Sequence, residues 1–218
     1  MKFILKEKEA ATFDMDGVLV NTEKFWRQAE YEVFSELGVV VTDELSLLTQ
    51  SMSTKEVTEF WFQMYPWNDK LLKDVELSVV YRVMELIRNS DCCIPGVQTF
   101  IETLKSQDIK IGLATNSPEI IIPVVLEKTK TLTLFDAISS ADAEVKGKPH
   151  PSIYLNTARK LNVSPEKCFV IEDSIWGIEA GIRAGMTVIQ FSNDCNNYFN
   201  SMADFVIHDF RDALTNLR

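Results

Sequence analysis

The sequence predicts an α/β fold: a parallel sheet core into which a helical domain is inserted. Two observations lead to this prediction. Short apolar segments typical of buried strands alternate with longer segments of helical pattern, as expected for a parallel sheet covered by helices. One stretch, residues 23–91, interrupts the alternation because it carries helical periodicity without a convincing strand.

The predicted core elements follow one another in a regular order. Several of the helical segments open with Ser, Asn or Pro, residue types that begin helices. The expected strands are Ala10–Phe13, Ile109–Ala114, Ala137–Ser139, Cys168–Ile171, Thr187–Phe191 and Asp204–Ile207. The expected helices are Val97–Ser106, Pro118–Lys128, Pro151–Leu161 and Ile175–Ala184.

The inserted helical domain has two plausible borders. Val20–Thr22 lies on one side, and Asp91–Gly96, which contains a Pro-Gly turn signal, lies on the other. We therefore expect residues 1–20 and 95–218 to form the catalytic core and residues 21–94 to form the helical domain.

Composition limits the classes of function. The 218 residues, 46% of them hydrophobic, are sufficient for a substantial core, and the net charge of −10 disfavours nucleic acid as a partner. No segment approaches the length of a membrane span or a signal peptide. Cys92, Cys93, Cys168 and Cys195 lack metal-site spacing, so reduced thiols and a cytoplasmic location are expected. A monomer is the default expectation.

Two aspartates directly follow the first predicted strand, where ligands bind in open parallel sheets. Asp14 and Asp16 favour a cation, and Mg²⁺ prefers such oxygen ligands. If Asp14 attacks a phosphate group, Mg²⁺ screens its charge. Asp16 then protonates the leaving oxygen and later deprotonates the attacking water. Gly17 allows the chain to turn sharply afterwards.

Two further segments offer groups for binding a phosphate. Thr115 and Asn116 end an apolar strand at the start of a helix, where a hydroxyl and backbone N–H groups hold phosphate well. Lys148 lies between Gly147 and a rigid Pro-x-Pro segment, and its ammonium can neutralise charge on a transferred phosphoryl group.

An acidic pair ends another predicted strand. Glu172 and Asp173 could complete a metal site with Asp14 and the backbone carbonyl of Asp16. At this point the sequence leaves open whether Glu172 binds the metal directly or orients its neighbours.

The four motifs, in their order and approximate spacing, resemble those of the haloacid dehalogenase superfamily, and the resemblance covers essentially the whole chain. The insertion after the first motif looks like the helical cap of the branch that holds beta-phosphoglucomutase and many sugar phosphatases. The family implies a Rossmann-like core. The motifs are Asp14-x-Asp16-Gly17, Thr115, Lys148-Pro149 and Glu172-Asp173.

The resemblance also implies a role for each matched residue. Asp14 is expected to be the nucleophile and Asp16 the acid/base, with Mg²⁺ held by these two residues and Asp173. The expected phosphate binders are Thr115, Asn116 and Lys148.

Each motif taken singly has a simpler interpretation. An Asp-x-Asp-Gly segment is more often a solvated turn, and Glu172-Asp173-Ser174 suits the start of a helix. Thr115 and Asn116 could only cap a helix, and Lys148 could be a surface residue beside a turn. The ordered set of four favours catalysis.

The sequence therefore predicts a Mg²⁺-dependent phosphatase that hydrolyses a small sugar or hexitol phosphate monoester through an aspartyl phosphate. The alternative is a phosphosugar mutase of the beta-phosphoglucomutase type. Trp26 occupies the place of a histidine in that mutase, and the loop Thr49–Lys55 lacks the mutase's Lys-Gly and Arg, which disfavours it. A signalling receiver domain leaves the insertion unexplained, and in a dehalogenase Asp16 and Asp173 would be superfluous.

Overall fold

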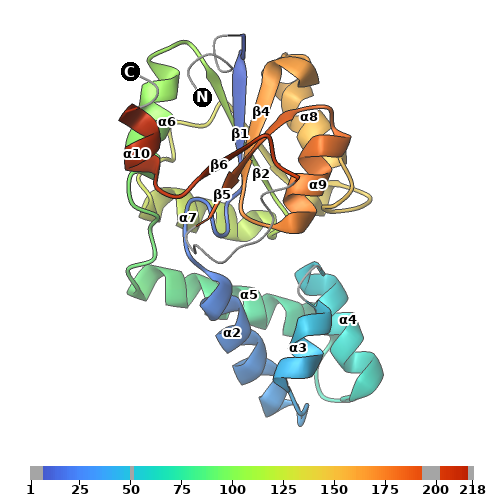
Figure 1. Cartoon of the computed structure of the whole chain (residues 1–218). Coiled ribbons are helices and arrows are strands. Elements are labelled where there is room, and N and C mark those ends of the chain that lie inside the picture. The colour runs from blue at the N-terminus through green and yellow to red at the C-terminus, as the bar shows by residue number, and fades with distance from the viewer. Residues whose placement is uncertain (1–6, 50–51, 193–201, 216–218) are drawn as a thin grey trace.

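A six-stranded sheet forms the centre of the computed structural model, which describes residues 7–49, 52–192 and 202–215 (Figure 1). All neighbouring strands are parallel, in the order β3-β2-β1-β4-β5-β6. Because the chain moves outward to one edge and then to the other, the order reverses beside β1, where ligands bind in such sheets. The strands are β1 (Ala10–Phe13), β2 (Lys110–Thr115), β3 (Ala137–Ser140), β4 (Cys168–Glu172), β5 (Thr187–Phe191) and β6 (Phe205–Ile207).

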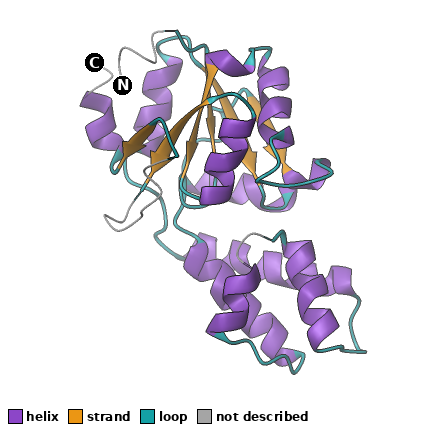
Figure 2. Ribbon diagram, turned by 45° about the vertical axis from the view of Figure 1, so that its right-hand side comes forward, coloured by secondary structure: helices purple, strands orange, loops and turns teal. Residues whose placement is uncertain are grey.

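Helices cover both faces of this sheet (Figure 2). Side chains alternate along each strand, so Phe13 and Leu113 face one layer while Ala114 and Val170 face the other. The first layer contains α6 (Val97–Lys105), α7 (Ile122–Lys128) and α10 (Phe210–Thr215). The second layer contains α8 (Ser152–Leu161) and α9 (Ile175–Arg183). The predicted α/β fold with a Rossmann-like parallel core is confirmed.

Four further helices form a separate group beneath the carboxyl ends of the strands (Figure 1). Helix α5 packs against both α2 and α4. Aromatic side chains of α2 and α4 also contact each other, with the ring centroids of Phe34 and Trp61 6.0 Å apart. A capping box at Ser53 begins α4. The helices are α2 (Glu23–Glu36), α3 (Asp43–Thr49), α4 (Thr54–Met64) and α5 (Leu72–Asn89). An inserted helical region is thus present, while its expected limits at 21 and 94 stay a prediction.

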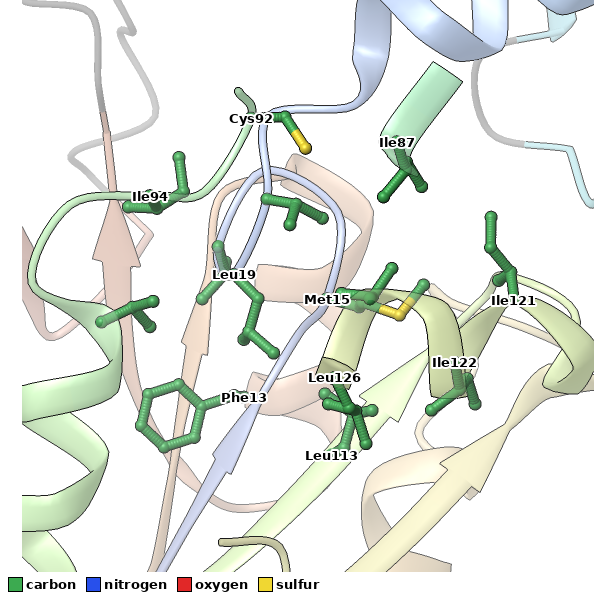
Figure 3. Packing of buried hydrophobic residues seen from close by; sticks show 14 of the residues in the cluster. Phe13, Met15, Leu19, Ile87, Cys92, Ile94, Leu113, Ile121, Ile122 and Leu126 are labelled. Atoms are coloured by element: carbon green, nitrogen blue, oxygen red, sulfur yellow. The ribbon is translucent and has the colours of Figure 1, made fainter. Parts of the chain in front are cut away.

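The two chain segments that join the helical group to the core are paired with each other. Asn21 donates its backbone N–H to the carbonyl of Cys92 at 2.8 Å, and Ile94 donates to Leu19 at 2.9 Å. Figure 3 shows Ile87, on the last turn of α5, pointing toward Met15 beside these linkers. The buried apolar cluster is therefore continuous from β1 into the cap helices.

Apart from one helix, the expected element limits match the structure or differ from it by one residue, within the usual uncertainty of element ends. The largest difference is at Pro118–Lys128, where a 3₁₀ turn, η1 (Glu119–Ile121), precedes α7. Among the described helices, none is both long and apolar enough to cross a membrane. Cys92, Cys93 and Cys168 are free thiols, whereas Cys195 and residues 1–6 lie outside the described residues.

The contact between α9 and the sheet generates a stability prediction. A Cβ on Gly181 would lie 2.6 Å from Cγ2 of Val170 and 2.9 Å from Cγ2 of Val188. Because valine side chains are stiff, overpacking should outweigh the better helix propensity of alanine. We expect Gly181→Ala to lower the free energy of unfolding by about 1–2 kcal/mol, measured by urea denaturation. A smaller loss is expected in a Val170→Ala background, and undiminished stability of the single variant would contradict the close approach.

Candidate active site

The carboxyl ends of β1, β2 and β4 open into a cavity of about 610 Å³ that also reaches helix α2. The structure thereby brings together residues that lie far apart in the sequence. Of the seven residues expected at the site, Glu172 alone does not line this cavity, because it lies behind Lys148 and is fully buried. The six that do are Asp14, Asp16, Thr115, Asn116, Lys148 and Asp173.

A buried lysine is the centre of the site. The ammonium of Lys148 donates to Oδ1 of Asp14 at 2.5 Å, to Oε1 of Glu172 at 2.5 Å and to the carbonyl oxygen of Ala114 at 2.8 Å. These three bonds use all three of its donors. Burial alone lowers the pKa of Lys148, but the carboxylates of Asp14 and Glu172 outweigh this effect and raise it above its usual value. Lys148 is therefore a permanently charged group.

Glu172 holds this lysine from behind. Its Oε1 also accepts a hydrogen bond from the hydroxyl of Tyr154, and its Oε2 accepts bonds from the backbone N–H and hydroxyl of Ser174. Gly177 makes room for it, since a Cβ there would lie 2.0 Å from the carboxylate. Both oxygens of Glu172 are thus occupied by protein donors. This arrangement suits a residue that orients Lys148.

Asp14 extends from the end of β1 into the cavity. Burial raises its pKa to about 8; the nearby Lys148 opposes the rise, while Glu172 and Asp16 add to it by repulsion. Among the described residues, only its Oδ1 accepts a hydrogen bond, from Lys148. The other carboxylate oxygen is free to act as a nucleophile or as a ligand.

Asp173 approaches Asp14 across the turn at Gly17. Gly17 has a φ of +80°, and a Cβ at this position would lie 1.7 Å from Oδ2 of Asp173. The glycine is therefore required both for the left-handed backbone and for the close approach of the carboxylate. Burial, followed by the charges of Asp14 and Glu172, raises the pKa of Asp173 well above its usual value.

This group of carboxylates fits a divalent cation. Carboxylate oxygens of Asp14, Glu172 and Asp173 lie within 4.8 Å of one another, and Mg²⁺ takes oxygen ligands. Burial and mutual repulsion raise the pKa of both Asp14 and Asp173, and a divalent cation would offset both effects. Because Glu172 is already fully hydrogen-bonded, Asp14 and Asp173 are the better candidates for direct ligands.

The side chain of Asp16 points away from this group. Its Oδ1 accepts hydrogen bonds from the hydroxyl of Thr22 and, at 3.0 Å, from Nε1 of Trp26, while its Oδ2 accepts from the hydroxyl of Ser117 at 2.6 Å. These donors come from the first turn of α2 and from the segment after β2. The carboxylate of Asp16 is thus oriented separately from that of Asp14, as two different chemical roles require.

The two residues expected to bind phosphate at the end of β2 have different surroundings. Thr115 accepts a hydrogen bond from the backbone N–H of Ser117 at 3.0 Å, which leaves its hydroxyl proton available to an anion. The side chain of Asn116 instead forms two hydrogen bonds with the backbone of Lys148. It accepts one from the N–H at 2.9 Å and donates one to the carbonyl at 3.3 Å. Asn116 therefore positions the segment that carries Lys148.

Sequence reasoning did not assign site roles to several residues that the structure places in contact with the expected ones. Ser117 and Ser174 stood inside the motifs, so their proximity could have been expected. Trp26 was noticed for its place in a comparison with a mutase, whereas its bond to Asp16 depends on how α2 is oriented. Tyr154 had no local signal, because α8 brings it to Glu172 only in the folded chain.

Comparison with known proteins supports the same interpretation. The haloacid dehalogenase-like hydrolase family, described as a hydrolase, matches residues 8–185. Hexitol phosphatase B of Escherichia coli strain K12 is 35% identical over 181 residues, which are 83% of this chain and 82% of that enzyme. Beta-phosphoglucomutase of Bacillus subtilis is 28% identical over 188 residues, which are 83% of this chain and 82% of that enzyme.

A similar solved structure is CbbY from Rhodobacter sphaeroides in complex with phosphate. It has a TM-score of 0.82 and 27% identity, and the likeness covers 93% of this chain and 95% of CbbY. Fold, cavity and family match agree with the resemblance seen in the four sequence motifs. This chain belongs to the haloacid dehalogenase-like hydrolases and is an enzyme of that family.

Proposed function

We propose that this enzyme is a Mg²⁺-dependent phosphatase that hydrolyses a small sugar or hexitol phosphate monoester through an aspartyl phosphate on Asp14. The observation that carries the proposal is the position of Asp14, a buried carboxylate that lines the cavity and has one oxygen bonded to Lys148. The relation to hexitol phosphatase B supports the substrate class. The cytoplasmic location and the monomeric state stay predictions.

The first half of the reaction forms the intermediate. A free oxygen of Asp14 attacks phosphorus, and the bond between phosphorus and the ester oxygen breaks. Asp16 gives its proton to the departing oxygen, so the product leaves as a neutral alcohol. Lys148 and the hydroxyl of Thr115 stabilise the negative charge on the transferred phosphoryl group. Asp14, Asp173 and the backbone carbonyl of Asp16 would hold a Mg²⁺ ion, which would neutralise charge as the two anions approach.

The second half returns the enzyme to its starting state. Asp16, now a carboxylate, takes a proton from a water molecule that attacks the phosphorus of the aspartyl phosphate. The bond between phosphorus and the Asp14 oxygen breaks, and inorganic phosphate is released. The same residue thus acts as acid and then as base, which requires a stable orientation near the reacting oxygen. Thr22, Trp26 and Ser117 provide that orientation.

The second candidate is a mutase, which the relation to beta-phosphoglucomutase of Bacillus subtilis favours. A mutase holds two phosphate groups, one on each side of the cavity. On the side formed by α2 to α4, Arg27 is the cation among the described lining residues, and it is paired with Glu23 at 2.7 Å. This weak provision of positive charge supports hydrolysis over phosphate transfer within a sugar.

Replacement of Asp14 by Asn tests the nucleophile. We expect Asp14→Asn to lose at least about 10³-fold in phosphate release, since the amide is not a nucleophile of comparable strength. The assay is phosphate release from hexose, deoxyhexose and hexitol monophosphates, with conversion of β-glucose 1-phosphate to glucose 6-phosphate followed in parallel. Asp69→Asn, an exposed change purified in the same way, controls for contaminating phosphatase. Near-normal hydrolysis by Asp14→Asn would contradict the proposal that Asp14 is the nucleophile.

Magnesium binding should depend on pH in a defined direction. The metal-free protein holds Asp14 with a pKa near 8, so its proton favours the folded state as pH falls and this stabilisation is lost as pH rises from about 4 to 8. Mg²⁺ replaces that proton. We therefore expect Mg²⁺ to raise the melting temperature more at pH 8 than at pH 6, and EDTA to abolish activity. An increment independent of pH would contradict Asp14 as a ligand.

Trp26 should act through Asp16. Trp26→Phe keeps most of the ring but removes the N–H donor, so kcat should fall up to about tenfold, the value of one hydrogen bond. Because Asp16 protonates the leaving oxygen, the loss should be larger for a sugar phosphate than for p-nitrophenyl phosphate, whose leaving group needs little protonation. Trp67→Phe removes a similar N–H bond outside the cavity and serves as control. Equal losses on both substrates would argue against this role.

A further inference from the structure

Helix α2 presents one unexplained carboxylate to the cavity. Glu30 lies one turn beyond Trp26 on the same face of the helix, and both residues line the cavity. With a rise of 1.5 Å per residue, Glu30 is about 6 Å farther along the helix than the residue that contacts Asp16.

Glu30 has no partner within the protein that accounts for its position. Among the described residues its carboxylate forms neither a hydrogen bond nor an ion pair, although it is half-buried. Two hydroxyls that line the same cavity bond elsewhere: Thr49 donates to the carbonyl of Ser46, and Ser53 donates to Glu56. Burial raises the pKa of Glu30 to about 7, with Arg27 opposing the rise. A half-buried carboxylate without a hydrogen-bond partner in the protein is more typical of a binding site than of a structural one.

The charge balance on this side of the cavity indicates which ligand groups fit. Glu23, Arg27 and Glu30 are the charged residues of α2 that line it, and Arg27 is bound to Glu23. Both side chains of that pair are more than half exposed, at 59% and 73%. Because Arg27 is bonded to Glu23 and not to Glu30, Glu30 is the carboxylate of α2 at the cavity without an ion-pair partner among the described residues. A negative group on the far end of a substrate would be repelled here, whereas neutral hydroxyl groups would find a strong acceptor.

We propose that Glu30 determines substrate specificity by accepting hydrogen bonds from hydroxyl groups on the substrate's carbon chain and by repelling a second phosphate. This inference rests on the proposed function, because it assigns the polyol end of the substrate to α2 and the phosphate end to Lys148. The favoured substrates are then polyhydroxylated monophosphates. Bisphosphates and phosphate esters without hydroxyl groups are disfavoured.

The test compares three ligands of similar chain length: sorbitol 6-phosphate, hexyl phosphate and fructose 1,6-bisphosphate. In Glu30→Ala we expect the ratio of kcat/KM for sorbitol 6-phosphate to that for hexyl phosphate to fall at least about tenfold, the value of a hydrogen bond to a charged group. Glu30→Gln keeps an acceptor but loses the charge. In this variant the ratio of kcat/KM for fructose 1,6-bisphosphate to that for sorbitol 6-phosphate should rise by a similar factor. Glu36→Ala, an exposed change on the same helix outside the cavity, should leave both ratios as they are.

A binding measurement separates this inference from the proposed function. Calorimetry with Mg²⁺ in the Asp14→Asn background requires no turnover. There, addition of Glu30→Ala should weaken binding of sorbitol 6-phosphate at least about tenfold more than binding of hexyl phosphate. If the unaltered protein hydrolyses none of the esters but this difference persists, the proposed function fails and the role of Glu30 stands. If hydrolysis occurs and neither ratio changes in the Glu30 variants, or both substrates lose equally, the role of Glu30 is overturned.

Discussion

The ammonium of Lys148, buried between two carboxylates, is the interaction on which the site depends. It draws Asp14 from the end of β1, Glu172 from the end of β4 and the carbonyl of Ala114 near the end of β2 to one point. A buried ion pair of this kind adds little net stability, because desolvation offsets much of the attraction. Its value here is geometric. Three neighbouring strands are connected at the edge where the substrate's phosphate is expected.

The four carboxylates around this lysine lie close together but have different hydrogen-bond partners. Glu172 is saturated by Lys148, Tyr154 and Ser174, so it remains a structural anion. Asp14 and Asp173 keep carboxylate oxygens that could bind the proposed cation. Asp16 is turned to a separate set of donors, one of which, Trp26, belongs to the inserted helical group. The residue proposed as acid and base is thereby linked to the inserted helical group.

Much of the core was predictable because its signals are local. Buried parallel strands are short apolar runs, and each ended within a residue or two of its expected limit, as at Ile109–Ala114 against β2. The motif residues could be expected to lie together because each follows a strand, and the carboxyl ends of parallel strands meet at one edge of the sheet. Tyr154, Trp26 and Glu30 were not assigned roles, since their contacts depend on how α8 and α2 are placed in space. The helical region could be recognised as an insertion, but its periodicity does not specify which face of α2 meets the cavity.

The paired linkers couple the helical group to the sheet as one unit. With Asn21 bonded to Cys92 and Leu19 bonded to Ile94, the two covalent connections behave as a narrow ribbon, not as independent tethers. A ribbon bends easily across its flat direction and resists both twisting and sideways shear. The two linkers therefore cannot be displaced independently of each other, and any shift of α2 relative to the sheet would carry Trp26 and Glu30 together.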